Sequence, residues 1–173
     1  MTIQPVASTP AHVPTVALRY ALIPVHGYGI AVATVARMLD GDGDGDGDGD
    51  GDGDGDGARA RVLAPAEPVP YGAQPVLLAE STVYGMTCVE ELLQRWGPLP
   101  KPWLVLVSDA PAPPVPDARY LLRALGGRLA GVARVPYLPV LRGVRTADEA
   151  LEHKDVLAAA GRLRRTMEGT TRR

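Results

Sequence analysis

Apolar residues gather in short continuous runs along this chain, and stretches with helical spacing separate the runs. Four runs show no alternation with polar residues, at 16–25, 75–80, 103–107 and 129–135. Strands of this kind are typical of a parallel sheet that is buried on both faces. We therefore predict an α/β fold: a three-layer, mostly parallel sheet with helices on both faces, reduced in size and similar to that of P-loop proteins.

Helical spacing fills the first two intervals between these runs. Apolar residues at i, i+3 and i+7 predict a helix over about 31–39. A longer apolar stripe from Val83 to Trp96 predicts a second helix, for which Ser81 or Thr82 provides the N-cap.

The later part of the chain carries two more helix signals. A helix over about 117–125 should end at the glycine pair that follows it. Thr146 and Glu149 form a capping box, which predicts that one long C-terminal helix begins there and reaches about Met167.

These elements divide the chain into five segments. We expect a flexible N-terminal arm, a first strand–loop–helix unit, a disordered Asp-Gly and Pro-rich linker insertion, the remainder of the α/β domain, and a C-terminal helix with a basic tail. The corresponding ranges are 1–15, 16–39, 40–75, 76–145 and 146–173.

The linker contains the dipeptide Asp-Gly repeated nine times, over residues 40–57. Glycine maximises backbone entropy and the aspartates repel one another, so we expect no packed structure there. Calcium-binding repeats need an apolar residue in each repeat, and an EF-hand loop needs a terminal Glu. Neither is present, so the pattern favours a flexible acidic linker, with weak cation binding as the alternative.

The tract also distorts the charge of the chain. The formal net charge is −2, but without the nine aspartates of the repeat 18 basic residues face 11 acidic ones, a balance of +7. The single Cys88 rules out an internal disulfide and agrees with a reducing compartment. No apolar run is long enough to span a bilayer and no basic leader precedes the first run, so we expect a cytoplasmic protein without a membrane span.

Parallel strands bring their carboxyl ends to one edge of the sheet, which is where ligands bind in such folds. The residues expected at this edge are 26–34, 80–82, 109–114 and 136–141. His26, Glu80 and Asp109 would meet there with Ser81 or Ser108, as a hydrolytic triad requires. The chain has no G-x-S-x-G elbow, however, so helix and turn capping is the favoured role of these polar residues.

The loop after the first strand has part of a phosphate-binding pattern. Set against G-x-x-x-x-G-K-[ST], the segment 27–34 keeps the first Gly and the final Thr. Val32 replaces the second Gly and Ala33 replaces the Lys that carries charge to the phosphates. The helix N-terminus that remains would still attract an anion weakly.

The segment Val25-His26-Gly27-Tyr28-Gly29, followed by Ala33-Thr34-Val35-Ala36, resembles the deviant Walker A loop of ParA/MinD-type ATPases. The runs 103–109 and 129–137 resemble that family's strand before the base-contacting Asn and its G-x-I-P-Y-D strand and loop. The chain also looks like uncharacterised actinobacterial plasmid and phage proteins with an HGG-x-G-x-TT loop. The resemblance covers residues 16–145.

The resemblance implies a nucleotide site, with ATP or ADP and magnesium as the candidate cofactors. Its residues would be Gly27, Gly29, Ala33, Thr34, Asp109 and Pro136, with Thr34 as the magnesium ligand. The chain departs from the family where His26 and Ala33 replace the two lysines and Asp109 replaces the Asn. No Walker B carboxylate was found either, so we expect no hydrolysis and name no catalytic residue.

We therefore expect a catalytically degenerate ParA/MinD-like protein of a plasmid or phage accessory system, which binds a partner or nucleotide without hydrolysis. One alternative is an active partition or positioning ATPase that uses Lys101 or Lys154. The other is a purely structural or regulatory interaction domain with no ligand. Partners would be a protein, a second copy of the chain, or nucleic acid contacted by a basic C-terminal tail, whose arginines are Arg162, Arg164, Arg165, Arg172 and Arg173.

Overall fold

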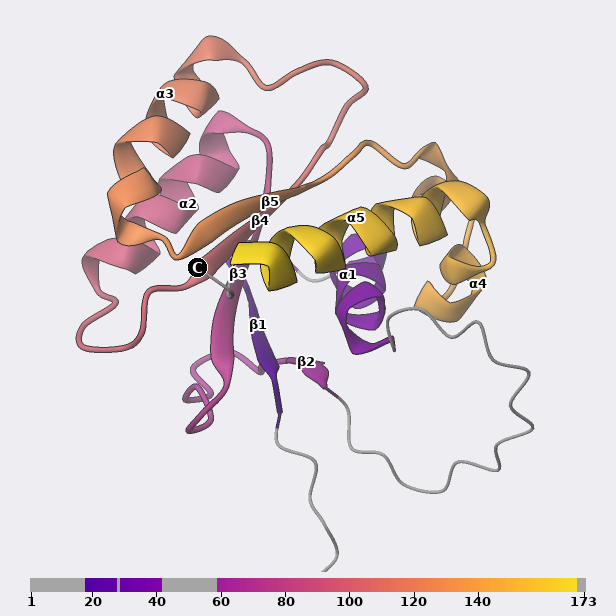
Figure 1. Ribbon diagram of the computed structural model, residues 1–173. Helices are drawn as coiled ribbons and strands as arrows, with labels where there is room; N and C mark the ends of the chain where they lie inside the picture. The colour runs from indigo at the N-terminus through magenta and orange to yellow at the C-terminus, as the bar shows by residue number, and fades with distance from the viewer. Residues whose placement is uncertain (1–17, 28, 42–58, 171–173) are drawn as a thin grey trace, which may run out of the picture.

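The computed structural model describes residues 18–27, 29–41 and 59–170. Five parallel strands form one sheet in the order β2-β1-β3-β4-β5 (Figure 1). The strands are β1 (Tyr20–Pro24), β2 (Ala60–Val62), β3 (Gln74–Glu80), β4 (Trp103–Val107) and β5 (Gly131–Val135). This order also occurs in doubly wound α/β sheets, in which β1 lies inside the sheet and the connections change direction beside it.

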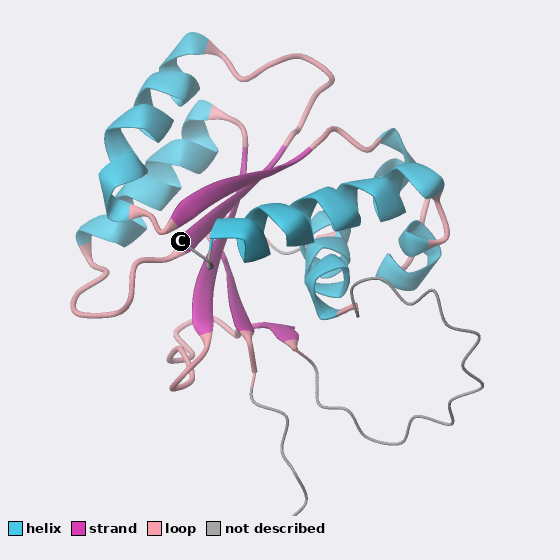
Figure 2. Cartoon of the chain, viewed as in Figure 1, coloured by secondary structure: helices cyan, strands magenta, loops and turns pink. Residues whose placement is uncertain are grey.

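Helices cover both faces of the sheet, which confirms the predicted α/β arrangement (Figure 2). They are α1 (Ile30–Asp40), α2 (Val83–Gln94), α3 (Pro116–Leu125), α4 (Ala147–Leu151) and α5 (Lys154–Thr170), with short 3-10 helices η1 (Gly126–Arg128) and η2 (Pro139–Arg142). Helices α1, α4 and α5 lie on one side and α2 and α3 on the other (Figure 1).

The continuous apolar runs are explained by a hydrophobic core on each face. Along β3, Leu78 packs towards α1 and α5, whereas its neighbours Leu77 and Ala79 pack towards α2 and α3. Successive side chains of a strand point to opposite faces, so a strand covered on both sides needs apolar residues throughout. Each fully buried Leu or Val stabilises the fold by about 1.5–3 kcal/mol.

The predicted linker is too long at its C-terminal end. Residues 60–62 form β2, whose Ala60 pairs with Tyr20 of β1, and Leu63 and Ala73 are buried in a small cluster with Ala21. Three strand residues between the Asp-Gly tract and a Pro-rich stretch give too short a pattern to stand out in the sequence. The N-terminal arm and most of the Asp-Gly tract lie outside the described residues.

The single C-terminal helix predicted from Thr146 is instead two helices. The capping box exists, because the N–H of Glu149 donates to Thr146 Oγ1 at 3.2 Å, but it opens only the five-residue α4. The chain turns at Glu152 and His153, and α5 then follows a new direction with Val156 fully buried. The apolar period continues across the turn, which hides the break in the sequence.

The remaining elements need only small corrections. The strand at 103–107 and the helix N-cap at Thr82 agree with the prediction, whereas β1 and β5 begin later than expected, at Tyr20 and Gly131. Across the described residues, no helix is both long and apolar enough to cross a membrane.

Candidate functional site

The carboxyl ends of β1, β3 and β4 enclose a hollow of about 180 Å³. From β1 the chain passes through α1 to β2, which lies on one side of β1, whereas β3 lies on the other side. The carboxyl end of β1 is therefore the switch point of the sheet. We call this cavity the switch-point hollow. It is lined by His26, Gly27, Gly29, Ala31, Val32, Leu78, Ala79, Glu80 and Val107.

Two glycines shape the connection from β1 to α1. Gly27 has φ of +58°, in the left-handed region that an L residue rarely adopts. Gly29 is the N-cap of α1 and has no side chain to accept a bond from the first turn. The first backbone N–H groups of α1 therefore depend on water or a ligand for their partners. Tyr28 lies outside the described residues.

The helix begins earlier than a phosphate-binding loop allows. Because α1 starts at Ile30, Val32 and Ala33 are helical, and Thr34 falls in the second turn. The Thr34 hydroxyl donates to the carbonyl of Ile30 at 2.7 Å, and the residue is 0% exposed. Thr34 therefore presents no surface to a magnesium ion in this conformation. Ala33 is exposed but does not line the switch-point hollow.

His26 joins the first loop to the end of β3. The backbone N–H of Glu80 donates to His26 Nε2 at 3.1 Å, so the neutral ring carries its proton on Nδ1. The imidazole also lies 5.7 Å from the ring centroid of Tyr84, tilted by 53°. His26, at the position where ParA/MinD-type proteins, which this loop resembles, have a signature Lys, thus fixes the wall of the hollow.

Gly85 supports two residues of the hollow's wall, Glu80 and His26, and the sequence did not reveal this role. A Cβ at this position would lie 2.4 Å from the Glu80 carbonyl oxygen and 3.1 Å from His26 Nε2. Only glycine lets the start of α2 approach β3 and the imidazole this closely. A glycine within a predicted helix is the only signal that the sequence offers.

The hydrolytic triad that the sequence analysis weighed against capping does not assemble. Ser81 is 5% exposed, and its hydroxyl donates to Asp109 Oδ1 at 2.9 Å, which links the ends of β3 and β4. His26 Nε2 accepts from the Glu80 N–H and the Ser81 hydroxyl donates to Asp109, so Ser81 and His26 do not form a nucleophile–base pair. The polar residues cap and connect strands, as the sequence favoured.

The other predicted site residues are divided between neighbouring hollows. Asp109 lines an adjoining hollow of about 230 Å³ together with Glu80 and Arg142, whose guanidinium carbon lies 5.5 Å from the Tyr137 ring centroid. Pro136 lines a third hollow, between η2 and α5. Of the six predicted residues, only Gly27 and Gly29 line the switch-point hollow.

The charges around the switch-point hollow do not suit a polyphosphate. None of its described lining residues is Lys or Arg, and Glu80 places a carboxyl group there. Lys101 precedes β4 and donates to the carbonyl of Gly127 at 2.8 Å, at the amino-terminal edge of the sheet and opposite the hollow. Within the described ranges, no group of three or more His, Cys, Asp or Glu is placed to hold a metal ion.

A larger groove of about 690 Å³ lies next to the switch-point hollow, on the side of α2. His26 and Gly27 line both spaces, and Tyr84 of α2 and Trp96, which follows the end of α2, contribute aromatic rings to the groove. The loop between β1 and α1 therefore lies between the small switch-point hollow and the larger groove, both of which are lined by more apolar than polar surface.

Comparison with known proteins adds no assignment to this geometry. The chain matches no family model, and neither a curated protein nor a solved structure matches it. The resemblance to ParA/MinD-type proteins therefore stays a prediction from sequence motifs, and the conclusion at this point is an α/β domain with an open switch point.

Proposed function

We propose that this chain is a catalytically inactive relative of ParA/MinD-type proteins, in a plasmid or phage accessory system, that binds a protein partner at the switch-point hollow without nucleotide turnover. The observation that supports it most is the contrast within one segment. Gly27 and Gly29 keep an open turn at the hollow, whereas Thr34 is buried with its hydroxyl bonded inside α1.

Size and charge favour a protein partner over a nucleotide. Small-molecule sites usually occupy about 300–1,000 Å³, whereas this hollow measures about 180 Å³. Removing both phosphate-loop lysines removes the main stabilisation of phosphoryl transfer. A short, uncharged peptide side chain would fit the switch-point hollow, and the adjoining groove offers further apolar contact.

The proposal is tested by site-specific photo-cross-linking in the native host. A photoreactive phenylalanine analogue replaces Ala31, which lines the hollow, or the exposed Ala124 of α3 as the matched control. We expect one discrete protein adduct from position 31 and none of that mass from position 124.

A second variant shows whether the adduct requires the hollow itself. Gly29→Leu fills the space without backbone strain, because Gly29 has φ of −160° and a Cβ there meets nothing within 4 Å. Gly126→Leu makes the same change at an open position far from the hollow. The proposal fails if position 31 gives no adduct, or if Gly29→Leu and Gly126→Leu leave the adduct equally strong.

A further inference from the structure

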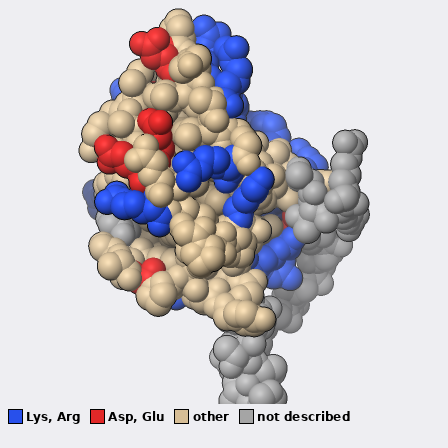
Figure 3. Space-filling model, turned by 90° about the vertical axis from the view of Figure 1, so that its left-hand side faces the viewer, with Lys and Arg blue, Asp and Glu red and all other residues tan. Residues whose placement is uncertain are grey.

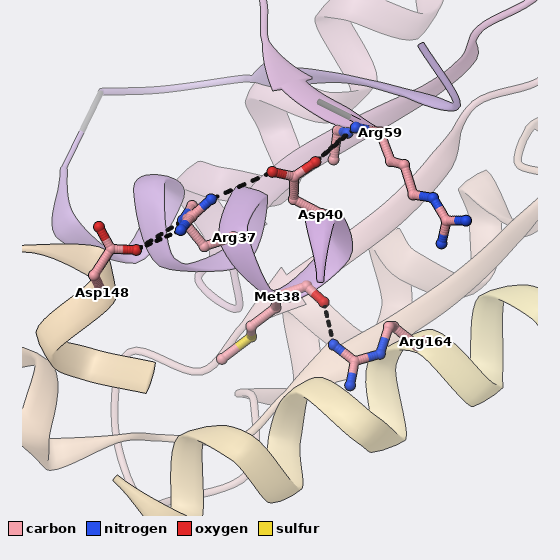
Figure 4. Close-up of polar contacts among 7 residues, drawn as sticks. Arg37, Met38, Asp40, Arg59, Asp148 and Arg164 are labelled. Carbon is pink, nitrogen blue, oxygen red and sulfur yellow. Dashed lines mark hydrogen bonds and ion pairs between the residues drawn. The ribbon is translucent and has the colours of Figure 1, made fainter. Parts of the chain in front are cut away.

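The first aspartate of the Asp-Gly tract is a structural residue. Asp40 Oδ1 accepts hydrogen bonds from the backbone N–H groups of Arg59, at 2.6 Å, and Ala60, at 3.2 Å (Figure 4). Its Oδ2 lies 3.4 Å from the guanidinium of Arg37, and the side chain is only 19% exposed. The Asp40 carboxylate thus accepts hydrogen bonds within the fold, whereas a surface carboxylate would be hydrated by solvent.

The returning chain is fixed at the same point by β1. The N–H groups of Arg19 and Tyr20 both donate to the carbonyl of Arg59 at 2.8 Å, and Ala60 then pairs with Tyr20. The chain therefore leaves α1 at Asp40 and re-enters the sheet within hydrogen-bond distance of that residue's own carboxylate.

The departing end of α1 is anchored independently by the C-terminal helices. Arg37 pairs with Asp148 of α4 at 2.7 Å, and Arg164 of α5 donates to the carbonyl of Met38 at 2.7 Å (Figure 4). Both contacts lie within the last turn of α1, where backbone carbonyls lack helical partners. Contacts of α1 with α4 and α5 thus help to set the position of Asp40.

We infer that Asp40 closes the base of a permissive insertion site. The chain between Gly41 and Arg59 can be shortened, lengthened or replaced while the domain keeps its fold and stability, whereas substitution of Asp40 lowers the stability. The two ends are held together by hydrogen bonds from the Arg59 and Ala60 N–H groups to Asp40, all three of which are described residues. Added length then costs only loop-closure entropy, which grows with the logarithm of the loop length and therefore slowly. The inference concerns stability and does not depend on the proposed function.

Shortening the insertion is the first test. Residues 42–57 are replaced by Gly-Ser, and a control of full length carries Ser in place of the eight aspartates of that segment. The control separates the removal of charge repulsion from the change in length. We expect the shortened chain to melt at the same temperature as the native chain or up to about 5 °C higher. A melting temperature more than about 5 °C lower would overturn the inference.

Two chemically identical substitutions test the role of Asp40. Asp40→Ala removes the acceptor for two N–H groups and should lower the melting temperature by about 4–10 °C, whereas Asp42→Ala, in the same dipeptide context, should change it by less than about 1 °C. Equal effects of the two substitutions would contradict the inference. Asp40→Asn keeps an acceptor oxygen, so its melting temperature should lie between those of Asp40→Ala and Asp42→Ala. This variant provides a readout if Asp40→Ala does not fold.

Discussion

Thr34 shows how its place within a helix decides what a hydroxyl group can do. A threonine at the first turn would face the carboxyl edge of the sheet, but α1 begins four residues before Thr34, at Ile30. The hydroxyl then has the carbonyl of Ile30 as its nearest acceptor, at 2.7 Å. His26 shows the same principle, because its imidazole serves the backbone of Glu80. Residue types that suit catalysis have structural partners here.

Gly85 is the residue at which a single methyl group should test this close packing. Gly85→Ala places a Cβ 2.4 Å from the Glu80 carbonyl oxygen and beside His26, so β3 or α2 must shift. We expect a loss of about 1–3 kcal/mol in the free energy of unfolding, measured by chemical denaturation. Gly126→Ala, where a Cβ meets nothing within 4 Å, is the matched control and should change it by less than about 0.5 kcal/mol. Equal losses would show that Gly85 lies in looser surroundings.

At the scale of elements, the helices and strands that the sequence predicted are those with a long apolar pattern. Strand β4 stands out because both of its faces are apolar, and helix α2 stands out because one full stripe along it is apolar. The three-residue β2 was missed because its stability comes from pairing with β1 and from the Asp40 carboxylate, neither of which leaves a local pattern. The hollow was predicted in place, since its position follows from strand direction, but its contacts depend on tertiary packing.

The segment after β2 is held by charge as well as by packing. Arg61 pairs with Glu67 at 2.7 Å, and this hydrogen bond, with a second from the Ala64 N–H, holds the pKa of the Glu67 carboxyl below its usual range. Because the pKa of Glu67 is lowered in the folded state, the stabilisation from its ion pair is present above the pKa of Glu67 in the unfolded chain. This stabilisation is lost as the pH falls through the pKa of Glu67 in the folded state.

Glu67→Gln should therefore destabilise the protein at neutral pH and have little effect in acid. The free energy of unfolding of the variant and of the native chain would be compared at about pH 7 and about pH 3. Glu152→Gln, at an exposed position for which no ion pair is seen among the described residues, serves as the control. A Glu67→Gln effect of the same size at both pH values would contradict this account of the loop.

At the scale of the whole molecule, the distribution of charge limits the choice of partner. The side that carries α2 and α3 shows basic side chains in several separate groups with acidic ones among them (Figure 3). In the C-terminal helix, Arg164 is occupied by the carbonyl of Met38, and Arg172 and Arg173 lie outside the described residues. The basic excess outside the Asp-Gly tract thus includes Arg164, which is bonded inside the fold, and this argues against a nucleic-acid contact that uses every arginine of the predicted basic tail.

Titration of Mg-ATP into the full-length chain by calorimetry tests the central claim, that this domain binds a protein partner and does not use nucleotide. The hollow has no Lys or Arg among its described lining residues, and Thr34 is withdrawn from it. We predict no binding tighter than about 1 mM, equivalent to −4.1 kcal/mol, and the same heats with and without magnesium. Magnesium-dependent binding with a micromolar dissociation constant would contradict the account and restore the phosphate-loop interpretation.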